Sequence, residues 1–129
     1  MKEFYSKLLS APSSVTTEIL YSILSVDFVS VPTPPLGPGA EGMNKTLHFF
    51  GEVIPNLSWV PQEILKHDDR FTVRSRATGT AIGPFLPVAT AANKSFDMMT
   101  IDILTVKHGR IVFSYHVEDW LTTITQLNA

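Results

Sequence analysis

Two aspartates and a tyrosine in the last third of the chain could together donate and accept protons. Residues 95–119 have the pattern of two strands joined by a tight turn at His108-Gly109. If the turn has two residues, Asp102 pairs with Tyr115. Asp119 then lies on the same face, because side chains alternate between the two faces of a strand. Carboxyl and phenol groups gathered in this way are typical tools of general acid/base catalysis.

The rest of this predicted face is mostly apolar, so the face is either a wet sheet edge or the lining of a pocket. Its other members are Met98, Thr100, Leu104, Val106, Ile111, Phe113 and Val117. Two simpler interpretations remain open. Asp119 directly precedes a short helical pattern and is a good helix cap, and a one-residue register error would turn Asp102 outward. In the same register His116 lies on the opposite face with Ser114 and Glu118, exposed to solvent or at a subunit contact.

The elements that must position these groups follow from spacing and from helix and strand breakers. Helical spacing predicts helices over 4–9, 15–24 and 43–54, the second capped by Ser13 or Ser14, and a last short helix over 120–127. Strands are expected over 26–31, 57–65 and 71–80 before the final pair, and loops over 32–39 and 83–95. Pro61 favours an edge position or a bulge for its strand.

Helices that come first, followed by a run of antiparallel strands, predict an α+β fold in one domain, residues 1–129. We expect a curved, mostly antiparallel sheet wrapped around the N-terminal helices as a cone or half-barrel. Such a fold leaves a concave cavity in which a small molecule can bind. The loop over 32–39 can lie across the mouth of this cavity.

Composition excludes several classes of function. The chain has 129 residues, 44% hydrophobic and 17% charged, with a net charge of −2, which predicts a globular protein with no affinity for nucleic acid or anionic membranes. We expect no membrane span and no signal peptide, and the lack of cysteine fits a cytoplasmic location. The four histidines are scattered without ligand spacing, so we expect no dedicated metal site.

Four segments carry a family resemblance: PLGPGAEGMNKTLHFF, RFTVRSRATGTAIGPF, IDILTVKHGRIV and HVEDWLTTITQL. Through them the chain resembles the SnoaL-like polyketide cyclases, members of the nuclear-transport-factor-two-like (cystatin-like cone) superfamily. The resemblance is clear from about Leu36 to Leu127. Its most specific part is the last strand, which runs to Asp119 and is followed by a short helix that ends in Gln126-Leu127.

This resemblance implies a function and a set of site residues. In the family's cyclases the aspartate at the position of Asp119 acts as general acid/base and removes a proton alpha to a carbonyl, so that the enolate closes a ring by an aldol step. The resemblance also implies that this step needs no metal and no organic cofactor. Asp102 and Tyr115 would hold the substrate oxygen or share the proton. The expected substrate-binding residues, for a small apolar carbonyl compound, are Tyr21, Met98, Thr100, Phe113, Val117, Phe50, Trp59 and Phe85. The chain departs from the family at Ala81, where a histidine is common, and at 113–115, where Glu-His-Trp is common.

Two other functions stay open beside a cyclase or isomerase. The same fold can serve as a non-catalytic binding or assembly module, and an open cavity that reaches Asp119 would favour an enzyme over a module. An epoxide hydrolase would need an arginine between two carboxylates, but the places beside Asp102 hold Thr100 and Leu104. Apolar residues on both faces of the strands at 57–65 and 71–80 predict a homodimer, with sheets packed face to face as in the family.

Overall fold

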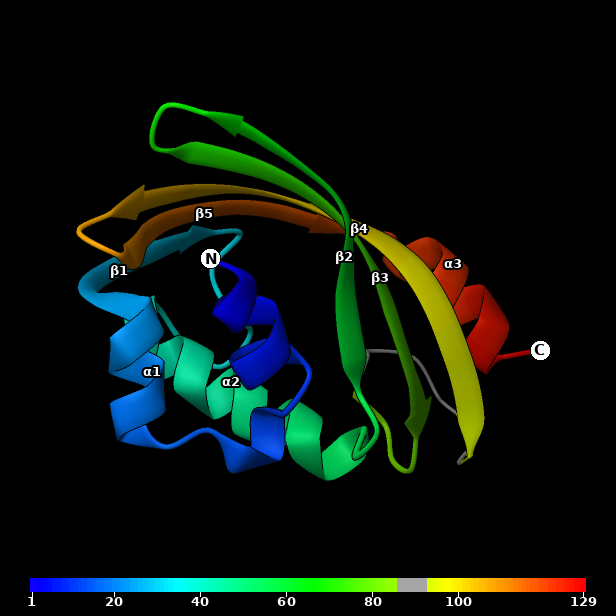
Figure 1. Ribbon diagram of the computed structural model, residues 1–129. Coiled ribbons are helices and arrows are strands. Elements are labelled where there is room, and N and C mark those ends of the chain that lie inside the picture. The colour runs from blue at the N-terminus through cyan, green and yellow to red at the C-terminus, as the bar shows by residue number, and fades with distance from the viewer. Residues whose placement is uncertain (86–92) are drawn as a thin grey trace.

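The computed structural model describes residues 1–85 and 93–129, in which five strands form one curved, mixed sheet (Figure 1). The strands are β1 (Leu24–Val31), β2 (Ser58–His67), β3 (Arg70–Ala81), β4 (Lys94–Lys107) and β5 (Arg110–Glu118). Their order across the sheet is β1-β5-β4-β3-β2, with β1 parallel to β5 and every other pair antiparallel. The predicted α+β fold with a mostly antiparallel sheet is confirmed. The loop expected over 83–95 includes 86–92, which lie outside the described residues.

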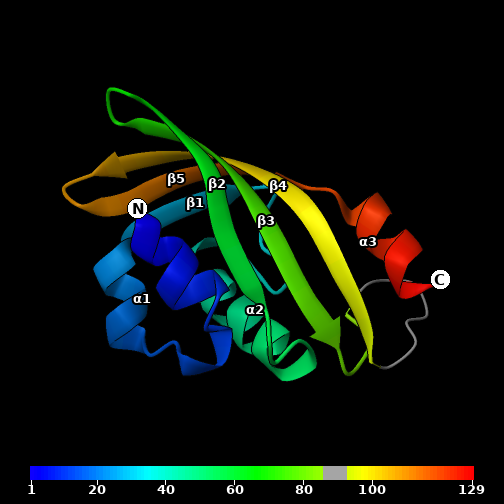
Figure 2. The same ribbon diagram turned by 45° about the vertical axis from the view of Figure 1, so that its right-hand side comes forward.

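Helical segments fill the concave side of the sheet (Figures 1 and 2). They are η1 (Phe4–Leu9), η2 (Pro12–Ser14), α1 (Thr17–Ile23) and α2 (Gly39–Val53). The cap of α1 differs from the prediction: the Thr16 hydroxyl, rather than Ser13 or Ser14, accepts a hydrogen bond from the Ile19 amide at 3.1 Å. No helix in the described part of the chain is long and apolar enough to cross a membrane.

The hydrophobic core lies between these helices and the sheet. Helix α2 contributes the fully buried Leu47, one of the residues whose spacing predicted the helix. From the sheet come Val73 and Leu104, and from η1 comes Leu8, all with no measurable exposure. Because the sheet curves around this core, side chains on its concave face can point at residues on η1 and α2, which is the arrangement that a cavity needs.

A β-bulge in β5 changes which of its side chains face the core. The turn at His108-Gly109 has the expected two residues, both with positive φ, and Val106 pairs with Ile111 as predicted. The next pair, however, is Thr105 with Phe113, so the register shifts by one residue at Val112. Since successive side chains alternate, every later residue of β5 faces opposite to the prediction.

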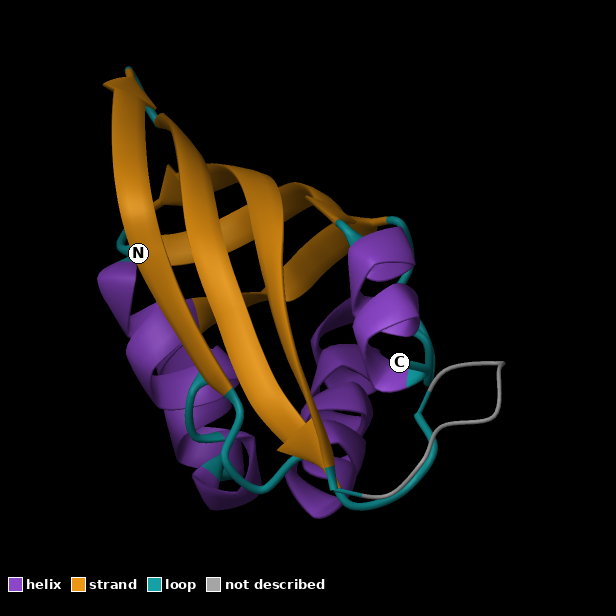
Figure 3. Ribbon diagram, turned by 90° about the vertical axis from the view of Figure 1, so that its right-hand side faces the viewer, coloured by secondary structure: helices purple, strands orange, loops and turns teal. Residues whose placement is uncertain are grey.

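The last helix, α3 (Trp120–Leu127), packs beside the first half of β4, next to the C-terminus (Figure 3). It lies away from α1 and α2 (Figures 1 and 2). Here β4 extends beyond the end of β5, since the last pair of the two strands is Thr100 with Glu118. The Gln126 side chain replaces the missing strand: its Oε1 accepts from the Asp97 amide at 2.7 Å, and its Nε2 donates to the Asp97 carbonyl at 3.0 Å. The helix therefore satisfies an otherwise open sheet edge.

The convex face of the sheet carries apolar side chains at its centre and paired charges towards β2. Tyr115 is 46% exposed and Val117 64% exposed on this face, with Ile101 and Ile103 half-buried between them and β3. The arginines of β3 pair on the same side, Arg74 with Glu63 and Arg76 with Asp97. Strand β2 is an edge strand with a register shift after Pro61, as predicted. The homodimer stays a prediction.

Candidate functional site

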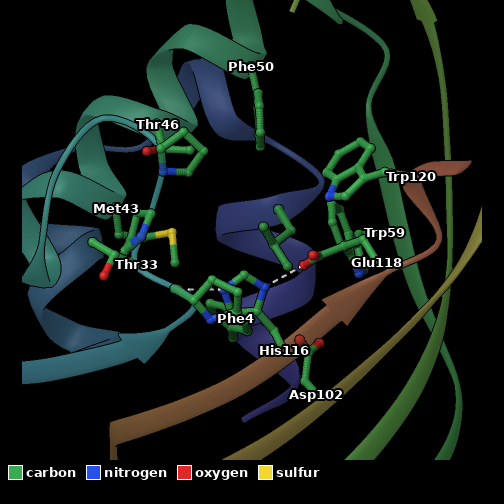
Figure 4. A pocket seen from close by; sticks show the side chains of 14 residues that line it. Phe4, Thr33, Met43, Thr46, Phe50, Trp59, Asp102, His116, Glu118 and Trp120 are labelled. Carbon is green, nitrogen blue, oxygen red and sulfur yellow. Dashed lines mark hydrogen bonds and ion pairs between the residues drawn. The ribbon is translucent and has the colours of Figure 1, made fainter. Parts of the chain in front are cut away.

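A cavity of about 190 Å³ lies between η1, α2 and the concave face of the sheet (Figure 4). Most of its wall is apolar, but one side carries three ionisable groups: Asp102, His116 and Glu118. Asp102 comes from β4 and the other two from β5, where the bulge turns them inward. Because Asp102 is the register partner of His116, the ionisable groups form one cluster.

Asp102 lies at the base of the cavity and is only 4% exposed. Its Oδ2 accepts a hydrogen bond of 2.7 Å from the Tyr5 hydroxyl, which reaches it from η1. Burial raises the pKa of Asp102 to about 6; the Glu118 charge adds to this rise, while the Tyr5 hydrogen bond and the His116 charge oppose it. Among the described residues no side chain or amide donates to Oδ1, so this oxygen is available to a bound molecule.

Tyr5 acts as a fixed donor to this carboxyl group. Burial, followed by the proximity of the Asp102 charge, raises the pKa of Tyr5 above its usual range, so the phenol keeps its proton at all working pH values. Spacing indicated a helix here, but it drew attention to Phe4, Leu8 and Leu9. Tyr21, which was expected to be the helix-borne donor, lies outside the cavity, next to the β4–β5 turn.

His116 is held between a carboxylate and a backbone carbonyl. Its Nδ1 lies 2.7 Å from Glu118 Oε1, and its Nε2 lies 2.8 Å from the Pro32 carbonyl oxygen. Both partners are acceptors, so both ring nitrogens donate when the histidine is an imidazolium. Burial lowers the pKa of His116, but the hydrogen bond and charge of Glu118 outweigh it, with help from Pro32 and Asp102, and the net pKa is raised. The raised pKa favours the imidazolium form, in which His116 would carry a positive charge beside Asp102.

The prediction that Asp119 and Tyr115 face the cavity is wrong. Asp119 is exposed and caps α3: its Oδ1 accepts from the Thr122 amide at 3.1 Å, and its Oδ2 accepts from the Thr122 hydroxyl at 2.6 Å. These hydrogen bonds lower the pKa of Asp119, where a general base needs a raised one. Tyr115 stacks on Phe113 on the convex face. The cause is the bulge at Val112, which sends Ser114, His116 and Glu118 inward.

The expected substrate-binding residues divide into three groups. Phe50 and Trp59 line the cavity as predicted. Phe85, Met98 and Thr100 lie close to the lining without forming part of it: Phe85 packs on Phe50 and Trp120, Thr100 accepts from Trp59 Nε1 at 3.0 Å, and Met98 is buried next to Thr100 on the concave face. The remaining three, Tyr21, Phe113 and Val117, do not line the cavity. Tyr21 lies next to the β4–β5 turn, and the bulge turns Phe113 and Val117 outward.

The proline-rich loop forms one wall, which agrees with its expected place at the mouth. Pro32, Thr33, Pro34 and Pro35 all line the cavity. The Thr46 hydroxyl of α2 accepts from the Leu36 amide at 3.2 Å and holds the end of the loop. This loop is therefore fastened at two points, to α2 through Thr46 and to β5 through His116.

Metal ligands are not gathered at this site. Within residues 1–85 and 93–129, no three histidine, aspartate or glutamate side chains lie together as metal ligands would. The ionisable side chains on the cavity wall are a carboxyl group of raised pKa, a histidine of raised pKa and a second acidic group. They are suited to moving protons.

Comparisons with known proteins agree with this fold. The sequence profile of the SnoaL-like polyketide cyclases matches residues 1–127. A candidate polyketide cyclase from Bacillus cereus ATCC 10987 is 30% identical, with 86% of this chain and 68% of that chain covered and a TM-score of 0.71. IdmH, a candidate polyketide cyclase from Streptomyces antibioticus, is 26% identical, with 96% and 95% covered and a TM-score of 0.77.

TsrD from Streptomyces laurentii has the same fold at 23% identity, with 99% of this chain and 89% of that chain covered and a TM-score of 0.80. A comparison with curated protein sequences gives no match. The family profile spans nearly all of the described fold, including the strands that carry the cavity. The chain therefore belongs to the SnoaL-like polyketide cyclase family.

Proposed function

We propose that this protein is a cyclase or isomerase that moves protons on a small carbonyl compound using only its own side chains. The observation that carries the proposal is Asp102, a buried carboxyl group with a pKa of about 6 at the base of an apolar cavity. Such a group is ionised at neutral pH and yet basic enough to remove a proton alpha to a carbonyl. Family membership and the candidate cyclases among its structural neighbours support the same class of reaction.

In this proposal Asp102 Oδ1 accepts the proton from carbon, while Oδ2 stays hydrogen-bonded to Tyr5. The C–H bond breaks, its electron pair forms the enolate, and the proton resides on the carboxyl group. The imidazolium of His116 lies beside Asp102 and lowers the free energy of the extra negative charge on the enolate. The protonated Asp102 then returns its proton to another atom in isomerisation, or to the new alkoxide after an aldol ring closure.

Two other functions have weaker support. A binding module needs the cavity but not a buried carboxyl group of raised pKa. Burying such a group costs stability, and groups of this kind are concentrated at functional sites. An epoxide hydrolase needs an arginine at the carboxylates, and no arginine of the described residues lines the cavity. Two arginines of β3, Arg74 and Arg76, pair with acids on the convex face instead.

The test is proton exchange, which needs no knowledge of the true substrate. We expect the wild-type protein to speed the exchange of the methyl protons of acetophenone for deuterium in D₂O, followed by ¹H NMR. Asp102→Asn keeps the shape of the side chain and an acceptor for Tyr5, but removes the base, so exchange should fall at least about 100-fold.

Asp119→Asn is the matched control, because Asp119 is the other aspartate considered for this role and lies outside the cavity. It should exchange protons at the wild-type rate. Equal rates for wild type and folded Asp102→Asn would refute the proposal, and loss of exchange in Asp119→Asn would return the catalytic role to that residue.

A further inference from the structure

The size, charge and stiffness of the cavity limit which carbonyl compounds can reach Asp102. Its volume of about 190 Å³ is below the roughly 300–1,000 Å³ of pockets that enclose drug-sized ligands. A cavity of about 150 Å³ in another protein binds benzene. The space therefore matches one ring with a short substituent, or an acyclic compound of similar size.

The charge of the cavity wall further limits which ligands can bind. The ionisable groups on the wall are Asp102, Glu118 and His116, and no lysine or arginine of the described residues lines the cavity. Two acidic side chains thus face a single histidine. A ligand with a carboxylate or phosphate would add a further negative charge in a site of low dielectric. His116 could not pair with this charge, because Glu118 and the Pro32 carbonyl already occupy both of its ring nitrogens.

The walls have little freedom to widen. Trp59 is held at its backbone by Ser10, whose hydroxyl accepts from the Trp59 amide at 2.7 Å, and at its indole by Thr100 at 3.0 Å. On the opposite side the proline-rich loop is tied to α2 by the hydrogen bond from the Leu36 amide to the Thr46 hydroxyl at 3.2 Å, and to β5 by His116, whose Nε2 lies 2.8 Å from the Pro32 carbonyl oxygen. An enclosed larger ligand would have to break these contacts.

From these three observations we infer that the substrate is a neutral carbonyl compound of one ring, or an acyclic compound of similar size, and that neither multi-ring ketones nor anions of the same size are accepted. The inference rests on the proposed function for the carbonyl group, but the size and charge limits concern binding alone. Met43 of α2 sets the limit on one side, since its side chain enters the cavity (Figure 4).

Binding can be followed at two known points, because the chain has only two tryptophans and both line the cavity. The probes are acetophenone, 2-acetylnaphthalene, 2-acetylanthracene and benzoate, titrated against ¹⁵N-labelled protein while the indole signals of Trp59 and Trp120 are recorded by NMR. We expect acetophenone to shift both signals and to saturate. Benzoate and the two-ring and three-ring ketones should bind at least ten-fold more weakly.

Met43→Ala removes part of the wall and should tighten binding of 2-acetylnaphthalene at least ten-fold relative to wild type. Met99→Ala is the matched control, since Met99 is half-exposed on the convex face and should leave all four affinities unchanged. The inference is overturned if 2-acetylanthracene or benzoate binds wild type as tightly as acetophenone, or if the folded protein binds none of the probes at millimolar concentration.

Failure of the proposed function would look different. If acetophenone binds selectively but Asp102→Asn exchanges its protons as fast as wild type, the size and charge limits stand and the acid/base role falls. If the three-ring ketone binds and undergoes Asp102-dependent exchange, the acid/base role stands and the size limit falls.

Discussion

At the scale of single residues, the site depends on how one carboxyl group is held. Asp102 lines the apolar cavity, and one of its oxygens accepts a hydrogen bond from Tyr5. His116 lies beside Asp102, and both of its ring nitrogens are occupied by other partners. Tyr5 and His116 therefore tune and orient Asp102, and neither has a free donor or acceptor for the substrate. This division of roles predicts separate effects for each residue.

Tyr5→Phe should change the pH dependence of proton exchange. The Tyr5 hydrogen bond stabilises the ionised carboxylate and so lowers the pKa of Asp102, against the larger effect of burial. A hydrogen bond worth about 1 kcal/mol corresponds to about 0.7 pH unit, so the midpoint of the pH–rate profile should rise by that amount. Tyr21→Phe, outside the cavity, should leave the profile unchanged. The same midpoint in folded Tyr5→Phe would show that Tyr5 does not tune the carboxyl group.

Asp102 should also make stability depend on pH. Its pKa rises from 3.8 in the unfolded chain to about 6 in the folded protein, so between these values the folded state binds more protons and stability falls as pH rises. At about 1.4 kcal/mol per pH unit, the loss is on the order of 3 kcal/mol by pH 7. Asp102→Asn should remove that part of the decline, measured by urea unfolding at pH 4 and pH 7.

The same unfolding measurements contain a contribution of the same sign from His116. Its raised pKa gives stability that is present at low pH and is lost as pH rises through the folded-state pKa. Asp102→Asn separates the two contributions because it leaves the Glu118 and Pro32 partners of His116 in place. Identical losses of stability between pH 4 and pH 7 in wild type and Asp102→Asn would contradict the raised pKa of Asp102 in the folded protein.

At the scale of elements, helix α2 and the proline-rich loop both line the cavity and pack against each other at very short range. Gly42 lies against Gly37, and only the lack of a side chain allows this approach. The same loop begins at Pro32, whose carbonyl oxygen lies 2.8 Å from His116 Nε2. The close contact between helix and loop is thus linked through the loop to the ionisable groups.

Gly42→Ala should destabilise the protein although alanine favours helices. At an uncrowded helix position this change stabilises by roughly 1 kcal/mol, but here the new Cβ would lie 1.8 Å from the Gly37 carbonyl oxygen, so the loop must move. We expect a loss of about 1–3 kcal/mol in the free energy of unfolding and weaker binding of acetophenone. Gly83→Ala is the control, since its Cβ would meet no atom of residues 1–85 or 93–129 nearer than 3.8 Å. A more stable Gly42→Ala variant would show that the loop is free to yield.

At the scale of the whole molecule, the sheet separates two surfaces of different use. The concave face holds the core and the cavity, and the convex face exposes Tyr115 and Val117 over the centre of the sheet. We propose that a second copy of the chain covers this face, because an apolar centre flanked by arginine–acid pairs has the composition of a subunit interface.

Val117→Lys should therefore convert a dimer into a monomer. Val117 is 64% exposed at the centre of the convex face, and a buried lysine without a partner would be expensive there. Sedimentation equilibrium at micromolar concentration should give twice the chain mass for wild type and the chain mass for the variant. Leu121→Lys, exposed on α3 away from the sheet face, should stay dimeric. A monomeric wild type would refute the proposal.

The sequence alone was sufficient for most of the elements and for the burial of Asp102. Helical spacing at Met43, Leu47 and Phe50, the two-residue turn at His108-Gly109 and the proline at the edge of β2 are local signals, and local signals persist in the folded chain. Asp102 stood out because an apolar strand does not bury an aspartate without a partner.

Only the tertiary structure decided which residue is the hydrogen-bond partner of Asp102 and which other ionisable residues lie beside it in the cavity. Tyr5 lies 97 positions away from Asp102, and no periodicity reports a contact over that distance. The bulge at Val112 exchanged Tyr115 and Asp119 for His116 and Glu118, because one extra residue reverses the facing of all that follow it in a strand. That bulge is set by how β5 packs between β1 and β4 around the core, which is a property of the assembled sheet and not of the segment that contains it.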